Sequence, residues 1–308
     1  ELSEMLTYDI TRSLSRYFQI DRGVLGADPG ILKPYKAIII AKPQDKFTES
    51  EKYIIDQYIM NGGRVLWLLD GARVSMDTLA TYGVTPAIDN DINLNDQLFR
   101  YGVRVNPNLL QDVQCAYIPV DKARQGEKAN YQPAPWYYAP LLFPSPASPI
   151  TKNITPVKSE FASSIDFVGK NEKINKEILL VTSQNSKALP APMRVGLEIL
   201  GMTADPNYFS EKYLPVAVAL NGVFPSVFEN RLPPKNVLIY EKPKYQSVKT
   251  RMVVVADGDI IRNEVTGVGA NSQPLPLGYD SYMNQEFGNK NFILNSVLYL
   301  TDDDGWLN

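Results

Sequence analysis

Two short, fully apolar runs separated by a helical pattern constrain the fold of this chain most strongly. Ala37–Ala41 and Val65–Leu69 read AIIIA and VLWLL, the pattern of strands that are buried on both faces. Between them, Thr48 and Glu51 have the spacing of a capping box, which predicts the start of a helix. Residues 61–63 (NGG) predict its end, because glycine takes the left-handed conformation there without strain. The stretch predicts a βαβ unit with parallel strands and a right-handed crossover.

Further apolar runs and one amphipathic segment continue this alternation. The strands expected beyond the βαβ unit are Ile178–Val181, Pro215–Leu220, Asn236–Tyr240 and Arg251–Asp257, and Asn289–Leu300 is expected to form a helix. A helix end, a glycine and an apolar restart are expected at residues 79–84, 98–103 and 197–202. We therefore predict an α/β fold with a mostly parallel sheet flanked by helices.

Proline divides the chain into three expected segments. Prolines punctuate the region at positions 119, 133, 135, 140, 144, 146, 149 and 156. Because proline lacks a backbone donor and restrains the residue before it, long helices and central strands are not expected there. The predicted organisation is an N-terminal α/β core segment over 1–118 and a proline-rich insertion over 119–175. A C-terminal α/β segment over 176–308 then completes the core or forms a second lobe.

Composition and charge exclude several classes of protein. The net charge of −3 offers no broad basic face, so we expect no nucleic-acid partner. No apolar run is long enough to span a bilayer. The chain nevertheless starts at Glu1 without an initiator Met, and we expect it to be a piece of a longer protein, in which an anchor is not excluded. Cys115 is the only cysteine and is expected to be a buried thiol that behaves as a small hydrophobic residue.

The complete absence of histidine limits the chemistry further. Ser-His-Asp and Cys-His nucleophile pairs both need an imidazole to accept a proton, so neither can form in this chain. A single cysteine with carboxylates is a poor zinc site. No glycine-rich phosphate loop occurs, and we expect no ATP hydrolysis. These absences predict a protein that is not an enzyme, with no metal and no cofactor.

Acidic residues follow two of the expected strands and form the candidate ligand site. Asp70 and Gly71 follow one strand, and Asp257 and Asp259 follow another. Ligands of open parallel sheets bind beyond the carboxyl ends of the strands, so this edge is a candidate for binding a cation, a sugar or a peptide. Two convergent carboxylates would also leave glycoside hydrolysis open. The alternative is that Asp and Gly only turn the chain after each strand.

An aromatic cluster lies inside the proline-rich region. Trp136, Tyr137, Tyr138 and Phe143 are interpreted as an interaction loop, since exposed aromatic residues suit contact with a protein or a glycan. The alternative is that these aromatic side chains pin the loop to the core.

Several long strings resemble one family. They are Asn93–Asn106 (NLNDQLFRYGVRVN), Ser148–Ile154 (SPITKNI), Pro156–Asp166 (PVKSEFASSID), Gly288–Asn295 and Tyr299–Gly305. Together they resemble the GldG family of gliding-motility-associated auxiliary, substrate-binding components of ABC transporters in the Bacteroidetes.

The resemblance implies a periplasmic domain between membrane helices, in a protein anchored in the inner membrane. It implies an ABC permease and an ATPase subunit as partners. It further implies a flavodoxin-like three-layer core similar to class I glutamine amidotransferases and to the N-terminal domain of an intraflagellar-transport protein. Amidotransferase chemistry would need a Cys-His pair, which this chain cannot supply.

These inferences favour a non-catalytic, extracytoplasmic binding or scaffolding domain of an ABC transporter complex linked to gliding motility or export. Two alternatives remain open at this point. One is a carboxylate-dependent glycan hydrolase that uses Asp70, Asp257 and Asp259. The other is a two-lobed solute-binding protein that closes on a glycan, a peptide or another small ligand.

Overall fold

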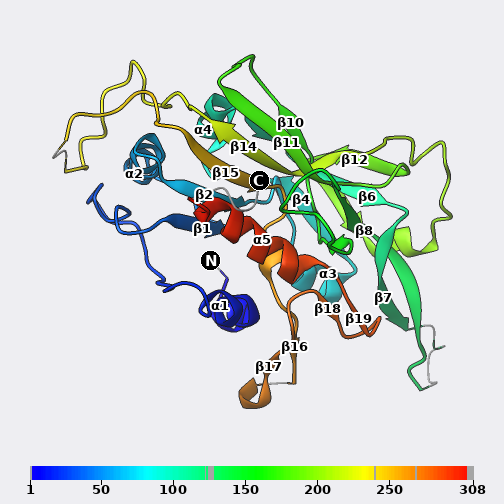
Figure 1. Cartoon of the computed structure of the whole chain (residues 1–308). Helices are drawn as coiled ribbons and strands as arrows, with labels where there is room; N and C mark the ends of the chain where they lie inside the picture. The colour runs from blue at the N-terminus through cyan, green and yellow to red at the C-terminus, as the bar shows by residue number, and fades with distance from the viewer. Residues whose placement is uncertain (1, 122, 124–127, 239–240, 268, 304–308) are drawn as a thin grey trace.

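An eight-stranded mixed sheet runs through the centre of the molecule (Figure 1). The computed structural model describes residues 2–121, 123, 128–238, 241–267 and 269–303. Along the sheet, the strands are β1 (Ala37–Ala41), β2 (Arg64–Leu68), β15 (Thr250–Val255), β14 (Pro215–Gly222), β11 (Ile174–Val181), β8 (Tyr131–Pro144) and β7 (Cys115–Asp121), with β9 (Val157–Lys158) paired to β8.

The predicted βαβ unit is confirmed. β1 and β2 are parallel and are joined by α2 (Glu49–Met60). The Thr48 hydroxyl accepts a hydrogen bond from the Glu51 backbone N–H, and the Glu51 carboxylate accepts one from the Thr48 N–H, which completes the capping box. At the other end, Asn61 caps the helix and Gly62 has a φ of 96°. Local sequence thus sets both boundaries of this helix.

The prediction of a mostly parallel sheet flanked by helices is wrong. Only β1, β2 and β15 run parallel to one another, whereas all pairings that involve β14, β11, β8, β7 and β9 are antiparallel. The apolar runs of β11 and β14 correctly indicate buried strands, but burial on both faces does not determine strand direction. The chain also returns from β14 to its neighbour β15 without a helix in the described part of that connection. The core is therefore not flavodoxin-like.

Helices are short and cover only part of the sheet. The α-helices besides α2 are α1 (Tyr8–Leu14), α3 (Met76–Tyr82), α4 (Asn95–Tyr101) and α5 (Asn289–Thr301), and the 3-10 helices are η1 (Met5–Thr7), η2 (Leu197–Gly201), η3 (Asp259–Ile261) and η4 (Gly269–Asn271). The predicted C-terminal helix is confirmed as α5, which lies across the sheet in Figure 1 and packs against β1, β2 and β15. No helix in the described residues is both long and apolar enough to cross a bilayer.

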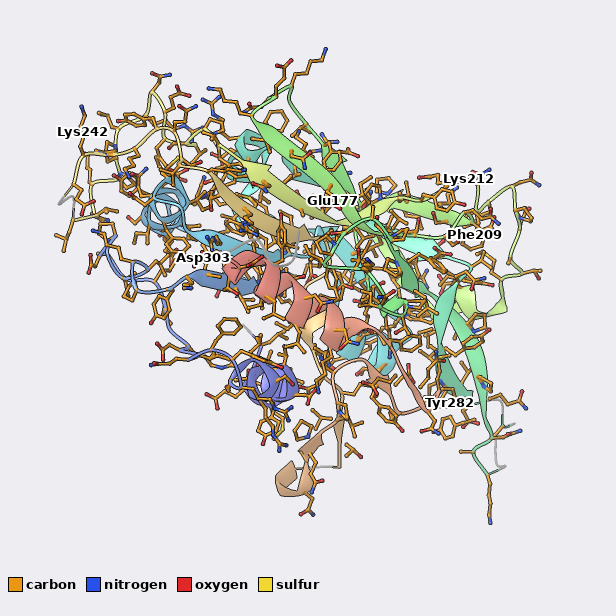
Figure 2. All side chains as sticks on the ribbon, in the orientation of Figure 1. Glu177, Phe209, Lys212, Lys242, Tyr282 and Asp303 are labelled. Carbon is orange, nitrogen blue, oxygen red and sulfur yellow. The ribbon has the colours of Figure 1, made fainter. Side chains whose placement is uncertain are left out.

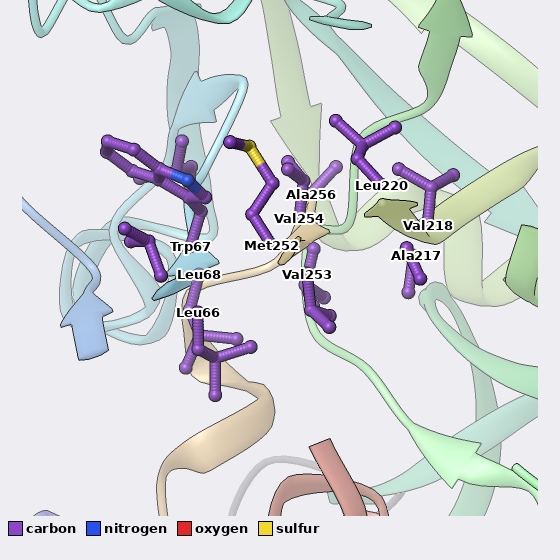
Figure 3. Close-up of a cluster of buried hydrophobic side chains, with 14 of the residues drawn as sticks. Leu66, Trp67, Leu68, Ala217, Val218, Leu220, Met252, Val253, Val254 and Ala256 are labelled. Atoms are coloured by element: carbon purple, nitrogen blue, oxygen red, sulfur yellow. The ribbon is translucent and has the colours of Figure 1, made fainter. Parts of the chain in front are cut away.

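The main hydrophobic core lies where the parallel and antiparallel parts of the sheet meet (Figure 3). Leu66, Trp67 and Leu68 of β2 are completely buried next to Val253 and Val254 of β15. Full burial of an aliphatic side chain stabilises the fold by roughly 1.5–3 kcal/mol. These central strands therefore hold the ends of β2 and β15, and the acidic residues that follow them, in fixed positions.

Small antiparallel sheets surround the main one. They consist of β3 (Ala72–Arg73), β4 (Val84–Asp89) and β13 (Met193–Gly196); β5 (Val103–Val105) and β10 (Ile165–Phe167); β6 (Asn108–Asp112) and β12 (Ser186–Pro190); β16 (Val265–Thr266) and β17 (Gln273–Pro274); and β18 (Tyr279–Asp280) and β19 (Gln285–Glu286). Two of the three predicted helix–glycine–strand patterns occur, with Gly83 after α3 and Gly102 after α4 in the left-handed conformation. The third, at Gly201, is the end of the 3-10 helix η2 instead.

The proline-rich region contains the longest strand of the described structure, contrary to expectation. β8 includes Pro133, Pro135 and Pro140, and ends at Pro144. Over its first residues β8 pairs with β7, and it pairs with β11 only at Phe143 and Pro144. Where a strand is paired along one side only, a proline needs no backbone N–H donor toward the unpaired side. This explains why β8 tolerates its prolines.

The last predicted features are one strand and the boundaries between the three segments. Residues 236–238 of the predicted strand Asn236–Tyr240 do not form a strand, and residues 239–240 lie outside the described part of the chain. The division at 118/119 and 175/176 stays a prediction, although both boundaries fall within strands, namely β7 and β11.

Candidate functional site

The carboxyl ends of β2 and β15 bring three aspartates together. Asp70 follows β2, and Asp257 and Asp259 follow β15, so the parallel pairing of these strands places them at one edge of the sheet. One carboxylate oxygen of each lies within 4.8 Å of the others, a spacing that could hold a cation. The structure thus groups the aspartates that sequence analysis selected, although ligand binding by them stays a prediction.

Lys42 supplies a positive charge to this cluster. It directly follows β1, the third parallel strand, and its ammonium forms an ion pair with Asp259 and lies 3.5 Å from the Asp70 carboxylate. Lys42 has a φ of 50°, an unusual backbone conformation for a residue with a long side chain. The ammonium contacts two of the three carboxylates that could hold a cation, and acts as their internal counter-ion.

Backbone donors hold the aspartates in place. The Asp257 carboxylate accepts hydrogen bonds from the N–H groups of Asp259 (2.7 Å) and Glu160 (3.0 Å). The Asp70 carboxylate accepts one from Gly258 N–H at 2.6 Å. Gly258 allows this approach, because a Cβ there would lie 2.8 Å from the Lys42 Cβ and 2.9 Å from the Asp70 carboxylate. The cluster is therefore tied together by its own loops.

Gly71, also predicted at the ligand site, has a packing role. A Cβ at this position would lie 2.1 Å from the backbone carbonyl oxygen of Asn106 and 2.6 Å from the Ser163 hydroxyl. Such distances leave no room for a side chain, so glycine is required for the close approach of these segments.

Burial dominates the electrostatics of the cluster. Removal from water raises the pKa of Asp70 and raises that of Asp257 well above its usual value, and neighbouring carboxylates add to both shifts. Burial by itself lowers the pKa of Lys42, but the charges of Asp70 and Asp259 outweigh it, and the pKa rises. The site thus combines a firmly charged lysine with carboxylates that hold protons more tightly than usual.

A cavity of about 320 Å³ opens beside the cluster. Its lining includes Asp259, Glu160, Arg262, Lys158 and Tyr279. Arg262 lies 3.4 Å from the Asp259 carboxylate, and Lys158 pairs with Glu264 and Asp280. The cavity therefore presents both charges and an aromatic ring, a mixture that suits a polar ligand.

Glu160 differs from the other charged residues of this cavity. Among the described residues, no hydrogen bond or ion pair involves its carboxylate, and burial raises its pKa.

Sequence analysis missed Lys42, Glu160 and Arg262. Lys42 could have been found from the sequence, because it directly follows a predicted parallel strand. Glu160 comes from a distant segment, and no sequence pattern indicates that it lies at this site.

The aromatic cluster occupies a second core instead of an interaction loop. Trp136, Tyr137 and Tyr138 lie on β8, and the Trp136 side chain is only 1% exposed. Trp136 contacts Phe161 edge to face with ring centroids 6.2 Å apart, and Tyr137 packs on Phe209 at 5.1 Å. Of the four predicted interaction residues, only Phe143 is substantially exposed, at 37%.

Cys115 joins the same second core. Its thiol is buried as expected, and burial raises its pKa to about 12. A thiol that stays protonated at neutral pH is a poor nucleophile, so Cys115 has a packing role.

A larger cavity of about 460 Å³ lies at the opposite edge of the sheet, at the start of β2 and the end of α2. Its charged lining residues are Lys33, Lys36, Arg64, Glu241, Lys242 and Asp303. Positive charge is in excess there. Asp303, at the end of α5 in Figure 2, pairs with both Lys36 and Arg64.

Comparisons with known proteins identify a similar fold and the family of this chain. No curated protein matches the chain. Among solved structures, the mmIFT52 N-terminal domain has a TM-score of 0.51 at 13% identity, over 99% of this chain and 94% of that one, which shows a shared fold. It is the kind of domain that the family resemblance implied. The model of the family described as an ABC-type uncharacterized transport system, ABC_transp_aux, matches residues 1–296. This match covers nearly the whole chain, which therefore belongs to that family of auxiliary components of ABC-type transport systems.

Proposed function

We propose that this chain is a non-catalytic, extracytoplasmic binding or scaffolding domain of an ABC transporter linked to gliding motility or export. The observation that carries the proposal is membership of the auxiliary family over residues 1–296. The GldG-like strings support the more specific assignment to a periplasmic domain anchored in the inner membrane. The absence of histidine supports a role without histidine-activated serine or cysteine nucleophiles and without zinc chemistry.

The proposed partners are an ABC permease and an ATPase subunit, and co-purification tests them. The full-length protein, tagged and extracted from membranes in mild detergent, is expected to recover both subunits. A tagged, unrelated protein of the same membrane is the control. Recovery of the full-length protein from the soluble fraction, without either subunit, would contradict the proposal.

Hydrolysis of a glycan is the weaker alternative. The carboxylates of Asp70, Asp257 and Asp259 are close enough for the pair geometry of a retaining glycosidase, which needs roughly 5 Å. However, Asp257 is fully buried and both of its oxygens accept backbone hydrogen bonds. A carboxylate that cannot reach a glycosidic oxygen can act neither as acid nor as nucleophile. The remaining pair, Asp70 and Asp259, is bound by the Lys42 ammonium, which favours a binding role.

A solute-binding role is tested at the cavity beside Asp259. Oligosaccharides, short peptides and divalent cations would be screened for an increase in melting temperature, since a ligand that binds only the folded state stabilises it. Glu160→Gln removes the one unpaired carboxylate described in this cavity while keeping the shape of the side chain. A ligand that stabilises the wild type but not this variant supports the role. A panel without any stabilising compound favours scaffolding.

A further inference from the structure

The outer edge of β1 is not paired with any described segment. β1 pairs with β2 on one side only. Just beyond the strand, Lys42 N–H donates to the Leu68 carbonyl at 2.9 Å. Because residues of a parallel strand direct their backbone groups alternately to the two sides, the N–H and C=O groups of Ala37, Ile39 and Ala41 point away from β2. No backbone or side-chain hydrogen bond from another described segment reaches them.

This edge lacks the features that normally prevent strands from pairing. β7, at the other end of the sheet order, contains Pro119 and ends at Asp121, and both residue types discourage addition of a further strand. β1 contains neither a proline nor a charged residue. Its central side chain, Ile39, is 38% exposed. An exposed apolar edge of this kind is a template for β-sheet addition.

The sequence of β1 is symmetric about Ile39. AIIIA reads the same in both directions, so in an antiparallel copy related by a two-fold axis through Ile39 each residue faces a residue of its own type. In this register Ala37 faces the partner's Ala41, Ile38 faces the partner's Ile40, and Ile39 faces itself. Ile39 directs its backbone groups outward, so it forms the pair that exchanges both hydrogen bonds, with Cα atoms roughly 5.5 Å apart.

The charges at the two ends of β1 are complementary. Lys33, Lys36 and Arg64 gather before β1, where positive charge is in excess. Beyond β1 lies the exposed Asp45, which forms no ion pair among the described residues, whereas Lys42 and Lys46 at this end are already paired with Asp259 and Asp91. Antiparallel pairing places the basic end of one copy against the acidic end of the other.

The same register sets Lys36 opposite the partner's Lys42, but each lysine already has a carboxylate partner in its own chain. The two-fold axis also places the excess positive charge at the start of β1 on the same side as the partner's Asp45, which lies beyond the end of its β1. Opposite charges at complementary positions favour one orientation over its reverse.

We propose that β1 joins a second copy of this chain in an antiparallel, two-fold symmetric pair centred on Ile39, which extends the sheet across both molecules. Such an interface is isologous, because the same strand contributes on both sides.

Cross-linking tests the register. Ile39→Cys introduces an accessible thiol, while the native Cys115 is buried. Mild oxidation is expected to convert the variant into a disulfide-linked dimer, because the Cα separation of the facing pair lies within the range that a disulfide spans. Ile88→Cys, at an exposed position on β4, is the matched control and is expected to remain monomeric on denaturing gels. Equal cross-linking of both variants would overturn the register.

Mass measurement tests the interface itself. Light scattering after gel filtration is expected to give a dimer for the wild type and for Ile88→Lys, and a monomer for Ile39→Lys, in which two like charges would meet. Circular dichroism confirms that each variant is folded. A monomeric wild type throughout the micromolar range, or a dimeric Ile39→Lys variant, would overturn the proposal. A monomer that binds only an extended peptide of another protein at β1 would also overturn it.

Discussion

At the scale of single residues, Lys42 is the key to the acidic edge of the sheet. Its ammonium contacts Asp259 and Asp70, whose side chains are only 8% and 10% exposed at the ends of β15 and β2. Buried carboxylates without a counter-ion are strongly destabilising. The arrangement explains how the fold tolerates three aspartates within 4.8 Å.

Lys42→Met is expected to lower the free energy of unfolding by about 3–5 kcal/mol, the usual consequence of removing one partner from a buried ion pair. The loss should be larger at pH 8 than at pH 5, because the remaining carboxylates repel each other only when ionised. Urea unfolding at both pH values measures this. Lys46→Met, which removes an exposed pair with Asp91, is the control and should have no measurable effect.

Asp257 should make stability depend on pH. Its folded pKa is raised, so the folded state holds a proton that the unfolded state releases above about pH 4. The resulting stabilisation is complete below the pKa that Asp257 has in the unfolded state. It is lost as the pH rises through the pKa that Asp257 has in the folded state.

Asp257→Asn removes this titration, and the decrease in unfolding free energy between pH 4 and pH 7 is expected to become smaller. Unfolding in urea across this range gives the slope for the wild type and the variant. An unchanged slope would show that Asp70 or Glu160, whose pKa values are also raised, carries the dependence instead.

At the scale of elements, β8 shows how context overrides composition. Its prolines predict an irregular loop, and its aromatic residues can then be interpreted as an exposed contact surface. In the structure, β7 pairs with the first part of β8, and Trp136, Tyr137 and Tyr138 fill the second core. The role of these aromatic residues therefore depends on partners that are distant in sequence.

Trp136→Ala is expected to lower the free energy of unfolding by about 3–5 kcal/mol, as for other large core side chains. Trp136→Phe should lose much less, because the indole N–H has no hydrogen-bond partner among the described residues. Phe143→Ala, on the same strand but substantially exposed, is the control and should have the smallest effect. If the Trp136 and Phe143 variants were equally stable, the aromatic residues of β8 would not form a core.

At the scale of the whole molecule, the main sheet links distant parts of the chain. β2 has β1 and β15 as neighbours, and β15 is contributed by residues 250–255. The strands β7, β8 and β9 extend the same sheet. The three expected segments therefore share one sheet.

A fragment of residues 1–118 is accordingly expected not to fold alone, because β2 would lose β15 and the buried face of Trp67 would be exposed. Circular dichroism during thermal unfolding should show no cooperative transition for the fragment and a single transition for the whole chain. A cooperative transition of the fragment would support an independent N-terminal domain.

The sequence alone was sufficient for features that depend on neighbouring residues. The capping box at Thr48, the glycines after α3 and α4, the βαβ unit and the aspartates at the strand ends all follow from local patterns and from the rule that parallel strands end at one edge. The symmetric strand around Ile39 is also visible in the sequence.

Only the tertiary structure decided which strands pair, and in which direction. The antiparallel partners of β14, the burial of Trp136 and the hydrogen bond from the Glu160 N–H to the Asp257 carboxylate all join residues that are far apart in the chain. Apolar runs indicate that a strand is buried. However, the backbone N–H and C=O groups of a buried strand can form their hydrogen bonds with either a parallel or an antiparallel neighbour. Local patterns therefore determine the elements and the acidic strand ends, while the packing of distant segments determines the sheet and the cavity beside them.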